Sequence, residues 1–318
     1  MGVGYLRPHA IRIIIWVTGW VIPLTFFGSS VRGQIATDSV SFWHSAPVYS
    51  PARGRLIAAV SSAGWAGGMG LLYGLWYRDY PQSSFHFFND GGEWLQIDKV
   101  GHCGSAYFTS LWASSLVKWT GASQRRSALL GSAMSLTFMT TIEVFDGFSS
   151  KWGFSKADML SNLSGTALFW GQEFLWKQQR VLFKYSYHRN ELAVLRPEVF
   201  GRGLAENVLK DYNGQTYWLS VNLKSFADKS RLPSWLNIAA GYGAGGMLYA
   251  NDESNTDGLF QNSRYRQFYL SPDIDWRKIP IKSGALKAVF TVLSFVKIPA
   301  PAIEYRSNGR WVLHGLYF

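Results

Sequence analysis

The sequence predicts an α+β fold in which a four-helix membrane-associated bundle is followed by a C-terminal antiparallel, outer-membrane-like partial β-sheet. Three observations lead to this prediction. Residues 55–181 contain four apolar stretches of helical length, with small residues at helix-packing spacing. After about residue 182 the pattern changes to the alternation typical of strands. Aromatic residues make up 16% of the chain, as do charged residues, a balance typical of proteins seated at a lipid interface.

The N-terminal residues are predicted to be a signal peptide that ends at residue 33. Arg7 and Arg12 precede the apolar stretch 13–27, and small residues follow it, so we expect cleavage after Gly33. The alternative is an uncleaved membrane anchor, although the apolar stretch is shorter than the roughly 20 residues that a spanning helix needs. Residues 34–54 are polar and mixed, and we interpret them as the N-terminal lead-in of the mature protein.

The charge and cysteine content limit the possible partners. Lysine and arginine number 31 against 20 aspartate and glutamate residues, which gives a net charge of +11 in 318 residues. The basic residues are scattered rather than grouped in runs, which argues against a nucleic-acid partner and favours membrane lipid. The single cysteine, Cys103, lies far from the N-terminus, so a lipid-modified N-terminal cysteine and an intrachain disulfide are excluded. We expect Cys103 to be a small buried apolar residue.

The helical region is predicted to cover residues 55–181. Residues 56–77 carry no charge, and their glycines have the spacing that lets a neighbouring helix approach closely, so a transmembrane or deeply buried helix is expected. Asp90-Gly91-Gly92 marks a turn in the aromatic connection that follows. Three further helices are predicted at about 98–119, 123–148 and 156–180.

The C-terminal region, residues 182–318, is predicted to be rich in strands. Ser307-Asn308-Gly309 is a hairpin signal between the last two strands, and Phe318 ends the final one, as in outer-membrane proteins. Five or six strands are too few for the smallest ordinary closed barrel of about eight, so we expect a partial sheet covered by helices. The alternative is a soluble antiparallel sheet. The expected strands lie at 216–226, 235–249, 266–276 and 301–318, with a helix at 283–297.

Polar residues within the apolar helices form the candidate functional site. They occur in pairs three or four residues apart, so each pair lies on one face of its helix. Three such faces in one bundle can meet at a single polar centre, an arrangement by which bundles build metal sites. The spacing leaves both a bound metal and a proton network open, and it identifies no cofactor. The candidate residues are Asp98, Lys99, His102, Glu143, Asp146, Asp158 and Asn162.

Simpler explanations exist for some of these residues. Asp98 could cap the helix that it begins, and Asp158 could do so in a capping box with the serine three positions before it. A single core histidine is ordinarily satisfied by one hydrogen bond, which is the alternative for His102. Glu143 and Asp146 come late in their helix, where the macrodipole disfavours negative charge, so capping does not explain them. These two residues therefore give the strongest indication of a site.

The order of these residues resembles a known family pattern, that of the YfiM-type predicted periplasmic lipoproteins and, more distantly, of the VanZ-like membrane proteins. The resemblance covers residues 98–170 and implies a small helical bundle in the bacterial envelope whose activity is not established. VanZ-like proteins are associated with glycopeptide resistance and so with envelope polymers. The strand-rich region would replace the lipid of a lipoprotein as the anchor. The resemblance is carried by Asp98-Lys99, His102, Glu143, Asp146, Phe154-Ser155, Asp158, Asn162 and Gly165.

The expected function is a structural or assembly role in the cell envelope of a Gram-negative bacterium, with the outer membrane favoured over the inner membrane. Membrane lipid is the expected partner, and outer-membrane protein complexes are further candidates. One alternative is an enzyme acting on an envelope lipid or glycan phosphate, with His102 as general acid/base and Lys99 steadying the phosphate. Another is a module that binds a lipid headgroup or a cation. The sequence contains no nucleophile elbow, zinc-protease motif or Gly-rich phosphate loop.

Overall fold

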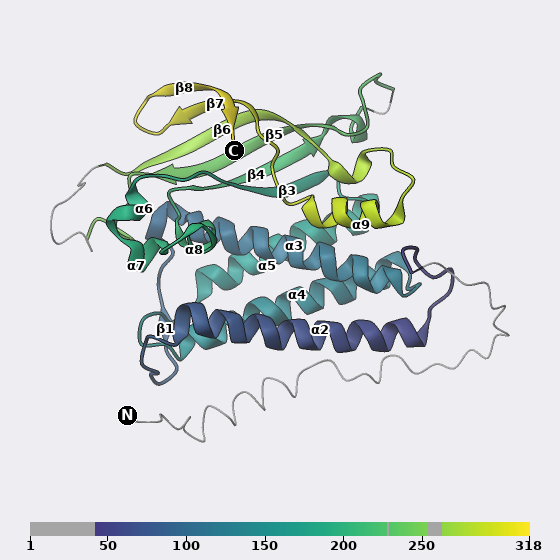
Figure 1. The fold of residues 1–318 in the computed structure, drawn as a ribbon, viewed down its shortest axis with the longest axis horizontal. Helices are drawn as coiled ribbons and strands as arrows, with labels where there is room; N and C mark the ends of the chain where they lie inside the picture. Colours follow the sequence, from purple (N-terminus) through teal and green to yellow (C-terminus); the bar gives the residue numbers. More distant parts are fainter. Residues whose placement is uncertain (1–41, 228, 254–262) are drawn as a thin grey trace.

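The computed structural model describes residues 42–227, 229–253 and 263–318. Within them the chain forms two layers, a group of helices and an antiparallel six-stranded sheet (Figure 1). The mixture of helices and strands that the sequence predicts is therefore confirmed. The predicted signal peptide, residues 1–33, lies outside the described residues.

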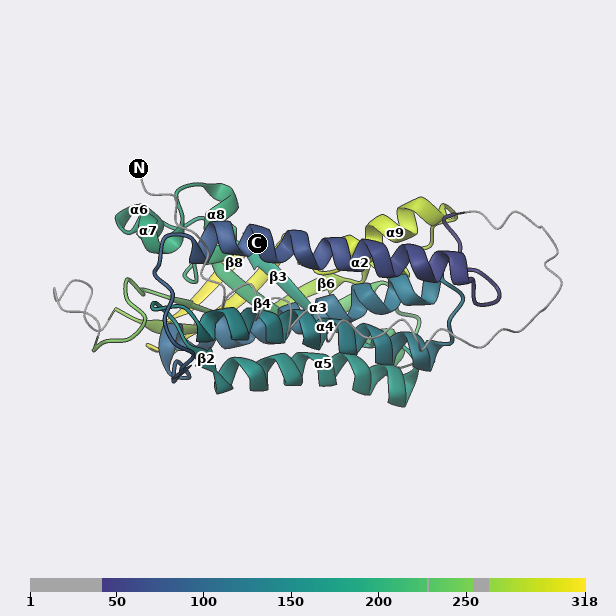
Figure 2. The ribbon, with the colours of Figure 1, turned by 90° about the horizontal axis from the view of Figure 1, so that it is seen from below.

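Four long helices form the helical layer and run side by side along the long axis of the molecule (Figures 1 and 2). Helix α3 lies nearest the sheet, and α2 lies on the side away from it. Two short strands pair in parallel: β1 (Phe87–Phe88), which lies between α2 and α3 in the chain, and β2 (Phe154–Ser155), which directly precedes α5. The helices are α2 (Pro51–Leu72), which a π-helical turn (Tyr73–Tyr77) extends, α3 (Ile97–Trp119), α4 (Gln124–Gly147) and α5 (Lys156–Trp176).

Glycines let α3 pack closely on α4 and α5. A methyl group on Gly131 of α4 would lie 2.4 Å from the backbone nitrogen of Ser114, and one on Gly165 of α5 would lie 1.9 Å from the carbonyl oxygen of Cys103. Both contacts are with backbone atoms of α3, which cannot rotate away as a side chain can. The prediction of close packing through small residues is therefore correct for these two helices.

Helix α2 packs loosely on the rest of the helical layer. The prediction that its glycines face a neighbouring helix is correct for Gly68, where a methyl group would lie 3.2 Å from the ring of Phe138 of α4. It is wrong for Gly64, Gly70 and Gly74, where a methyl group would meet no atom within 4 Å. The side of the helix that carries these three glycines faces away from the other helices, since only Gly54, Ile57 and Met69 of α2 are buried. Two helical segments of the described chain are long and apolar enough to cross a membrane, residues 51–77 and residues 124–147.

The sheet is an antiparallel meander of six strands in chain order. The predicted hairpin signal Ser307-Asn308-Gly309 lies in the turn before the last strand. The first strand and three short helices, α6 (Leu192–Leu195), α7 (Pro197–Phe200) and α8 (Leu204–Lys210), are absent from the prediction. The strands are β3 (Val181–Tyr187), β4 (Gln215–Asn222), β5 (Leu236–Gly245), β6 (Tyr265–Ile274), β7 (Ala300–Arg306) and β8 (Trp311–Tyr317).

The segment after α9 (Gly284–Leu293) covers the free edge of β3. The backbone N–H of Tyr185 donates to the carbonyl of Phe295 (2.7 Å), and the N–H of Lys297 donates to the carbonyl of Tyr185 (2.9 Å). The helix predicted at 283–297 is therefore shorter, because its last residues pair with a strand instead. This pairing satisfies backbone groups that an open sheet edge would leave exposed.

The sheet is curled, with a polar inner face and an apolar outer face. The hydroxyls of Tyr317 on β8 and Thr216 on β4 lie 2.9 Å apart, and Lys184 on β3 lies 2.7 Å from Asp273 on β6, although neither pair of strands is adjacent. Near the helices the outer face is buried, where Phe183 packs in the cluster that contains residues of α3. Farther out it is exposed through Leu219, Ile238, Phe268, Leu270, Ile303, Tyr305, Trp311 and Leu313.

Candidate functional site

The candidate site lies where the first turns of α3 and α5 meet the last turns of α4. Six of the seven predicted residues are in mutual contact there, and Asp146 lies one turn farther along α4, where it accepts a hydrogen bond from the hydroxyl of Tyr77 (2.8 Å). That these residues form a functional site stays a prediction. The six are Asp98, Lys99 and His102 from α3, Glu143 from α4, and Asp158 and Asn162 from α5.

Lys99 is buried among three carboxylates. Its Nζ lies 2.7 Å from Asp90 Oδ2, 2.8 Å from Asp98 Oδ2 and 2.7 Å from Asp158 Oδ1. Burial lowers the pKa of Lys99, but these carboxylates outweigh it and hold that pKa above the ordinary value of a lysine, so the ammonium stays charged. Asp90 belongs to the turn predicted from Asp90-Gly91-Gly92, yet it is not among the predicted site residues.

His102 is held through one ring nitrogen and leaves the other facing carboxylates. Nδ1 lies 3.2 Å from Asn162 Oδ1 and 3.3 Å from Glu143 Oε1. Because an amide oxygen only accepts, Nδ1 carries the proton in this arrangement. Nε2 lies 3.9 Å from both Asp98 Oδ1 and Asp158 Oδ1, which is too long for a hydrogen bond.

The capping alternative is correct only in part. Ser155 caps α5, because its hydroxyl oxygen accepts from the backbone N–H of Asp158 (3.1 Å). The return contact of a capping box comes from Glu143 of α4, whose Oε2 lies 3.4 Å from the backbone nitrogen of Ser155. Ser155 also donates to Asp90 Oδ1 (2.5 Å). The cap of α5 is therefore built into the polar centre.

Three buried polar atoms of the centre have no hydrogen-bond partner within the described residues: Glu143 Oε1, Asp158 Oδ1 and Asn162 Nδ2. Glu143 and Asn162 are 0% exposed and Asp158 is 5% exposed. Lys99 Nζ and His102 Nδ1 lie close to the two carboxylate oxygens, but without the angles of a hydrogen bond. Unsatisfied buried polar atoms are costly, although the ammonium of Lys99 at 2.7 Å partly compensates the charge of Asp158.

The electrostatics of the centre favour positive charge. Burial lowers the pKa of His102, but the carboxylates of Asp98, Asp158 and Glu143 outweigh burial and raise it above the ordinary value of histidine. Burial raises the pKa of Asp158 to about 6. Burial also opposes ionisation of Asp98, yet His102 and Lys99 hold its pKa below the ordinary value. The site therefore attracts a cation, whether a proton or another ion.

The sheet side of the molecule also contributes to the centre. Tyr212, in the loop between α8 and β4, donates to Asp98 Oδ1 (2.8 Å). Tyr217 of β4 lies over Gly101, since a methyl group there would lie 2.7 Å from the tyrosine hydroxyl. No spacing rule points to either tyrosine, because both reach α3 only through the fold.

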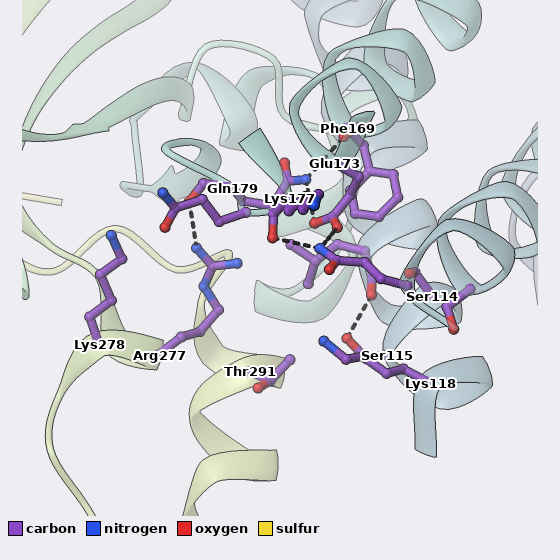
Figure 3. A pocket seen from close by; sticks show the side chains of 14 residues that line it. Ser114, Ser115, Lys118, Phe169, Glu173, Lys177, Gln179, Arg277, Lys278 and Thr291 are labelled. Atoms are coloured by element: carbon purple, nitrogen blue, oxygen red, sulfur yellow. Dashed lines mark hydrogen bonds between the residues drawn. The ribbon is translucent and has the colours of Figure 1, made fainter. Parts of the chain in front are cut away.

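A cavity of about 290 Å³ lies at the opposite end of the long helices (Figure 3). Glu173 there accepts hydrogen bonds from Gln124 (2.8 Å) and Gln179 (2.9 Å), and Arg277 donates to the carbonyl of Gln179 (3.3 Å). The cavity also contains Lys118, which is separated from Asp98 by most of α3. This cavity is thus distinct from the polar centre.

The curled interior of the sheet contains a second polar group, around Glu304. This carboxylate lies 2.6 Å from Arg306 Nε and 2.6 Å from His314 Nε2. Nearby, His188 Nδ1 lies 3.3 Å from the hydroxyl of Tyr317. The sequence pattern gives neither histidine a role, because strand spacing does not reveal which residues meet inside a curled sheet.

The comparisons with known proteins concern the same part of the chain as the polar centre. A family described as predicted periplasmic lipoprotein (DUF2279) matches residues 86–170, about a quarter of the chain. The matched segment contains every predicted site residue together with Asp90. No curated protein and no solved structure matches the chain. The more distant resemblance to VanZ-like proteins stays a prediction.

Proposed function

We propose that the chain is a membrane-associated protein of the Gram-negative cell envelope, with the outer membrane favoured, in which the polar centre has a structural or assembly role. The match to predicted periplasmic lipoproteins supports a cell-envelope protein of unknown activity. The main support for membrane association is the way in which polar and apolar side chains are distributed between the two faces of the sheet. Apolar side chains lie outward, and charged ones such as Lys184, Asp273 and Glu304 lie inside. A sheet in water ordinarily has the opposite distribution.

The apolar outer face is continuous across the strands. Leu270 of β6 is opposite Ile303 of β7, which is opposite Leu313 of β8. Leu313 is 79% exposed and the neighbouring Trp311 is 68% exposed. An apolar surface that extends over several strands is unfavourable in water by about 25 cal/mol per Å², and contact with lipid removes this cost.

The helices extend this apolar surface beyond the sheet. Outward-facing leucine, valine and aromatic side chains occur on α2, α5 and α9, so the proposed lipid contact includes both layers. The strands would then serve as the anchor in place of a lipid. The exposed residues are Leu56, Val60 and Leu71 on α2, Leu160, Leu163, Phe174 and Leu175 on α5, and Leu286, Val289 and Val292 on α9.

A structural role for the polar centre is supported by the number of segments that it joins. It links three helices to the turn at Asp90 and to Tyr212. Removing one partner of such a buried network leaves an uncompensated charge, at a cost of roughly 3–5 kcal/mol. The enzyme alternative has less support, because Lys99 already contacts three carboxylates and so is not free to steady a phosphate.

We also propose that residues 55–181 and 182–318 are the helical and strand-rich units of one membrane-seated body. A buried apolar cluster supports this arrangement, since Tyr107 and Phe108 of α3 pack there with Leu182 and Phe183 of β3. The two units would therefore enter the membrane together.

The proposal can be tested by spin labels on the full-length protein in lipid vesicles, after replacement of Cys103 by alanine. Labels introduced by Leu313→Cys and Leu270→Cys should collide more with oxygen, which partitions into lipid, than with a water-soluble nickel complex. A label introduced by Asn308→Cys in the exposed turn is the control and should show the reverse. Preference for the nickel complex at all three positions, or release of the native protein from cell membranes by an alkaline wash, would overturn the proposal.

A further inference from the structure

We propose that Asp98, His102 and Asp158 bind one divalent transition-metal ion through Asp98 Oδ1, His102 Nε2 and Asp158 Oδ1. One ligand atom from each residue lies within 4.8 Å of the other two. The three residues occupy the first turns of α3 and α5, two rigid helices that Gly165 holds in close contact. The inference goes beyond the structural role proposed above, and it does not depend on where in the envelope the protein lies.

The distances suit a metal site better than a hydrogen-bonded network. Nε2 of His102 is 3.9 Å from both carboxylate oxygens, so neither contact is a hydrogen bond. Two ligands of one tetrahedral ion, each bound at roughly 2.0–2.2 Å, stand about 3.3–3.6 Å apart. The two nitrogen–oxygen distances therefore need to shorten by about 0.3–0.6 Å, and the two carboxylate oxygens, which lie within 4.8 Å of each other, need to approach by no more than about 1.5 Å.

The histidine is oriented as a metal ligand. Its Nδ1–H donates to Asn162 Oδ1 (3.2 Å), so that in the neutral ring the lone pair of Nε2 is directed toward the two aspartates. Metal-binding histidines ordinarily donate their other nitrogen to a carboxylate or carbonyl group in this way. Glu143 Oε1 lies 3.3 Å from the same nitrogen but without the angles of a hydrogen bond. Asn162 is thus the positioning residue for His102.

Unsatisfied atoms are the second observation that points to a ligand. Asp158 Oδ1 is one of the three proposed ligand atoms, and the aspartate is only 5% exposed. This oxygen makes no hydrogen bond of good geometry within the described residues, and the ammonium of Lys99 at 2.7 Å is its only charged partner there besides His102. A bound cation would supply the further partner that this buried oxygen can accept.

The carboxylates of the centre outnumber its lysine ammonium, which favours the binding of a divalent cation. Asp90, Asp98 and Asp158 surround a single ammonium, that of Lys99, with Glu143 behind the histidine. Bringing several carboxylates together out of water is strongly unfavourable unless cations accompany them. A divalent ion bound at Nε2 of His102 would take the place of the proton that these carboxylates otherwise favour on that nitrogen, with a net gain of one positive charge.

Lys99 determines how the ion would bind. Its ammonium lies 2.7 Å from Asp158 Oδ1, so the ion must share that oxygen with it or displace it. The ammonium is therefore a competitor within the site. Removing it should strengthen metal binding, whereas in a purely structural network its removal could only do harm.

The ligand set favours Zn²⁺ or Mn²⁺. One imidazole nitrogen with carboxylate oxygens suits these ions, while Ca²⁺ takes six to eight oxygen ligands. With three protein ligands, a fourth position would remain for water or for a group of another molecule.

The test uses the full-length protein in detergent, stripped with a chelator and titrated with Zn²⁺ and, separately, Mn²⁺ by calorimetry. We expect one ion per chain with a dissociation constant below about 10 μM for at least one of the two metals. His102→Gln should weaken binding at least about 100-fold, and Asn162→Leu should weaken it about 10- to 100-fold through the lost orientation of His102. Asp146→Asn is the matched control, because this carboxylate contacts Tyr77 outside the proposed site, and it should change binding less than about threefold.

Lys99→Met keeps the proposal testable if the other variants fold poorly. It should bind the ion at least about tenfold more tightly than the wild type, and the ion should raise its melting temperature. Absence of one-to-one binding in the wild type at about 100 μM metal, or equal binding by the wild type and His102→Gln, overturns the proposal. Neither result would bear on the lipid contacts of the sheet, so the metal site and the membrane proposal fail separately.

Discussion

Asp98 shows how the position of a side chain in a helix leaves its role open. It lies in the first turn of α3, where a carboxylate gains from the helix dipole. It does not cap the helix: Gln96, two residues earlier, occupies the capping position in a left-handed conformation (φ 63°). The oxygens of Asp98 bind the ammonium of Lys99 and the hydroxyl of Tyr212 instead. Asp98 therefore belongs to the polar centre, although its position in the helix also suits capping.

The helix-borne residues of the centre could be predicted from spacing, and the loop-borne ones could not. His102 follows Asp98 by one turn, so the two must lie on one face wherever the helix forms. Asp90 and Tyr212 reach the same place through the path of their loops, and no periodicity fixes that path. The prediction thus found the residues of the centre that the helices carry and missed those that connect the centre to its surroundings.

Tyr212→Phe tests the link between the sheet side and the centre. The variant removes only the hydroxyl that donates to Asp98 Oδ1, which leaves a buried charged acceptor short of one donor. The expected loss is about 1–3 kcal/mol, seen as a lower melting temperature in detergent. Tyr73→Phe, at an exposed tyrosine near the end of α2, is the control and should melt as the wild type does. Equal melting of both variants would contradict a stabilising role for this bond.

At the scale of elements, the long helices are easier to predict than the strands or the short helices. The ranges of α3 and α4 follow from long apolar stretches, and Ser123 caps the second as its sequence position suggests. Strand β3 was missed, because Lys184 interrupts its apolar residues and looks like a surface position. The structure buries this lysine against Asp273, a partner about 90 residues farther along the chain, so only the fold reveals why it is there.

Gly165 and Gly171 lie on the same helix, α5, and provide a matched pair of tests for helix packing. A methyl group at Gly165 would collide with the backbone of Cys103, so Gly165→Ala must push α3 and α5 apart. We expect a loss of about 1–3 kcal/mol in stability. Gly171→Ala meets no atom within 4 Å and should leave stability unchanged or raise it by up to about 1 kcal/mol. Thermal unfolding compares the two, and equal melting temperatures would show that α3 and α5 are not tightly packed.

At the scale of the whole molecule, the curl of the sheet decides which residues become neighbours. Alternation along each strand predicts two faces, but it does not say which face turns inward. The curl places Trp218, Tyr269 and Tyr317 in one cluster and encloses Glu304 with His314. The last strand thereby contacts β4 as well as β7, which a flat sheet would not allow. The sequence therefore predicts the individual strands better than it predicts which of them meet across the curled sheet.

The buried interior of this curled sheet should make the stability of the molecule depend on pH through Lys297. Burial lowers the pKa of Lys297 to about 8, Asp273 at 3.9 Å opposes the shift, and Lys184 adds to it. Between about pH 8 and the ordinary value of 10.5, the unfolded chain holds a proton that the folded chain has lost, so stability gains from this residue as pH rises.

Lys297→Met removes this dependence. Measured by thermal unfolding in detergent, the wild type should gain about 1–3 kcal/mol relative to the variant as the pH is raised from below 8 toward 10, the direction that follows from a lowered lysine pKa. Lys287→Met, at an exposed lysine of α9, is the control and should follow the wild type at every pH. If the wild type and Lys297→Met instead keep a constant difference across this range, Lys297 remains charged in the folded protein. The interior of the sheet would then be more hydrated than its packing around Trp218 indicates.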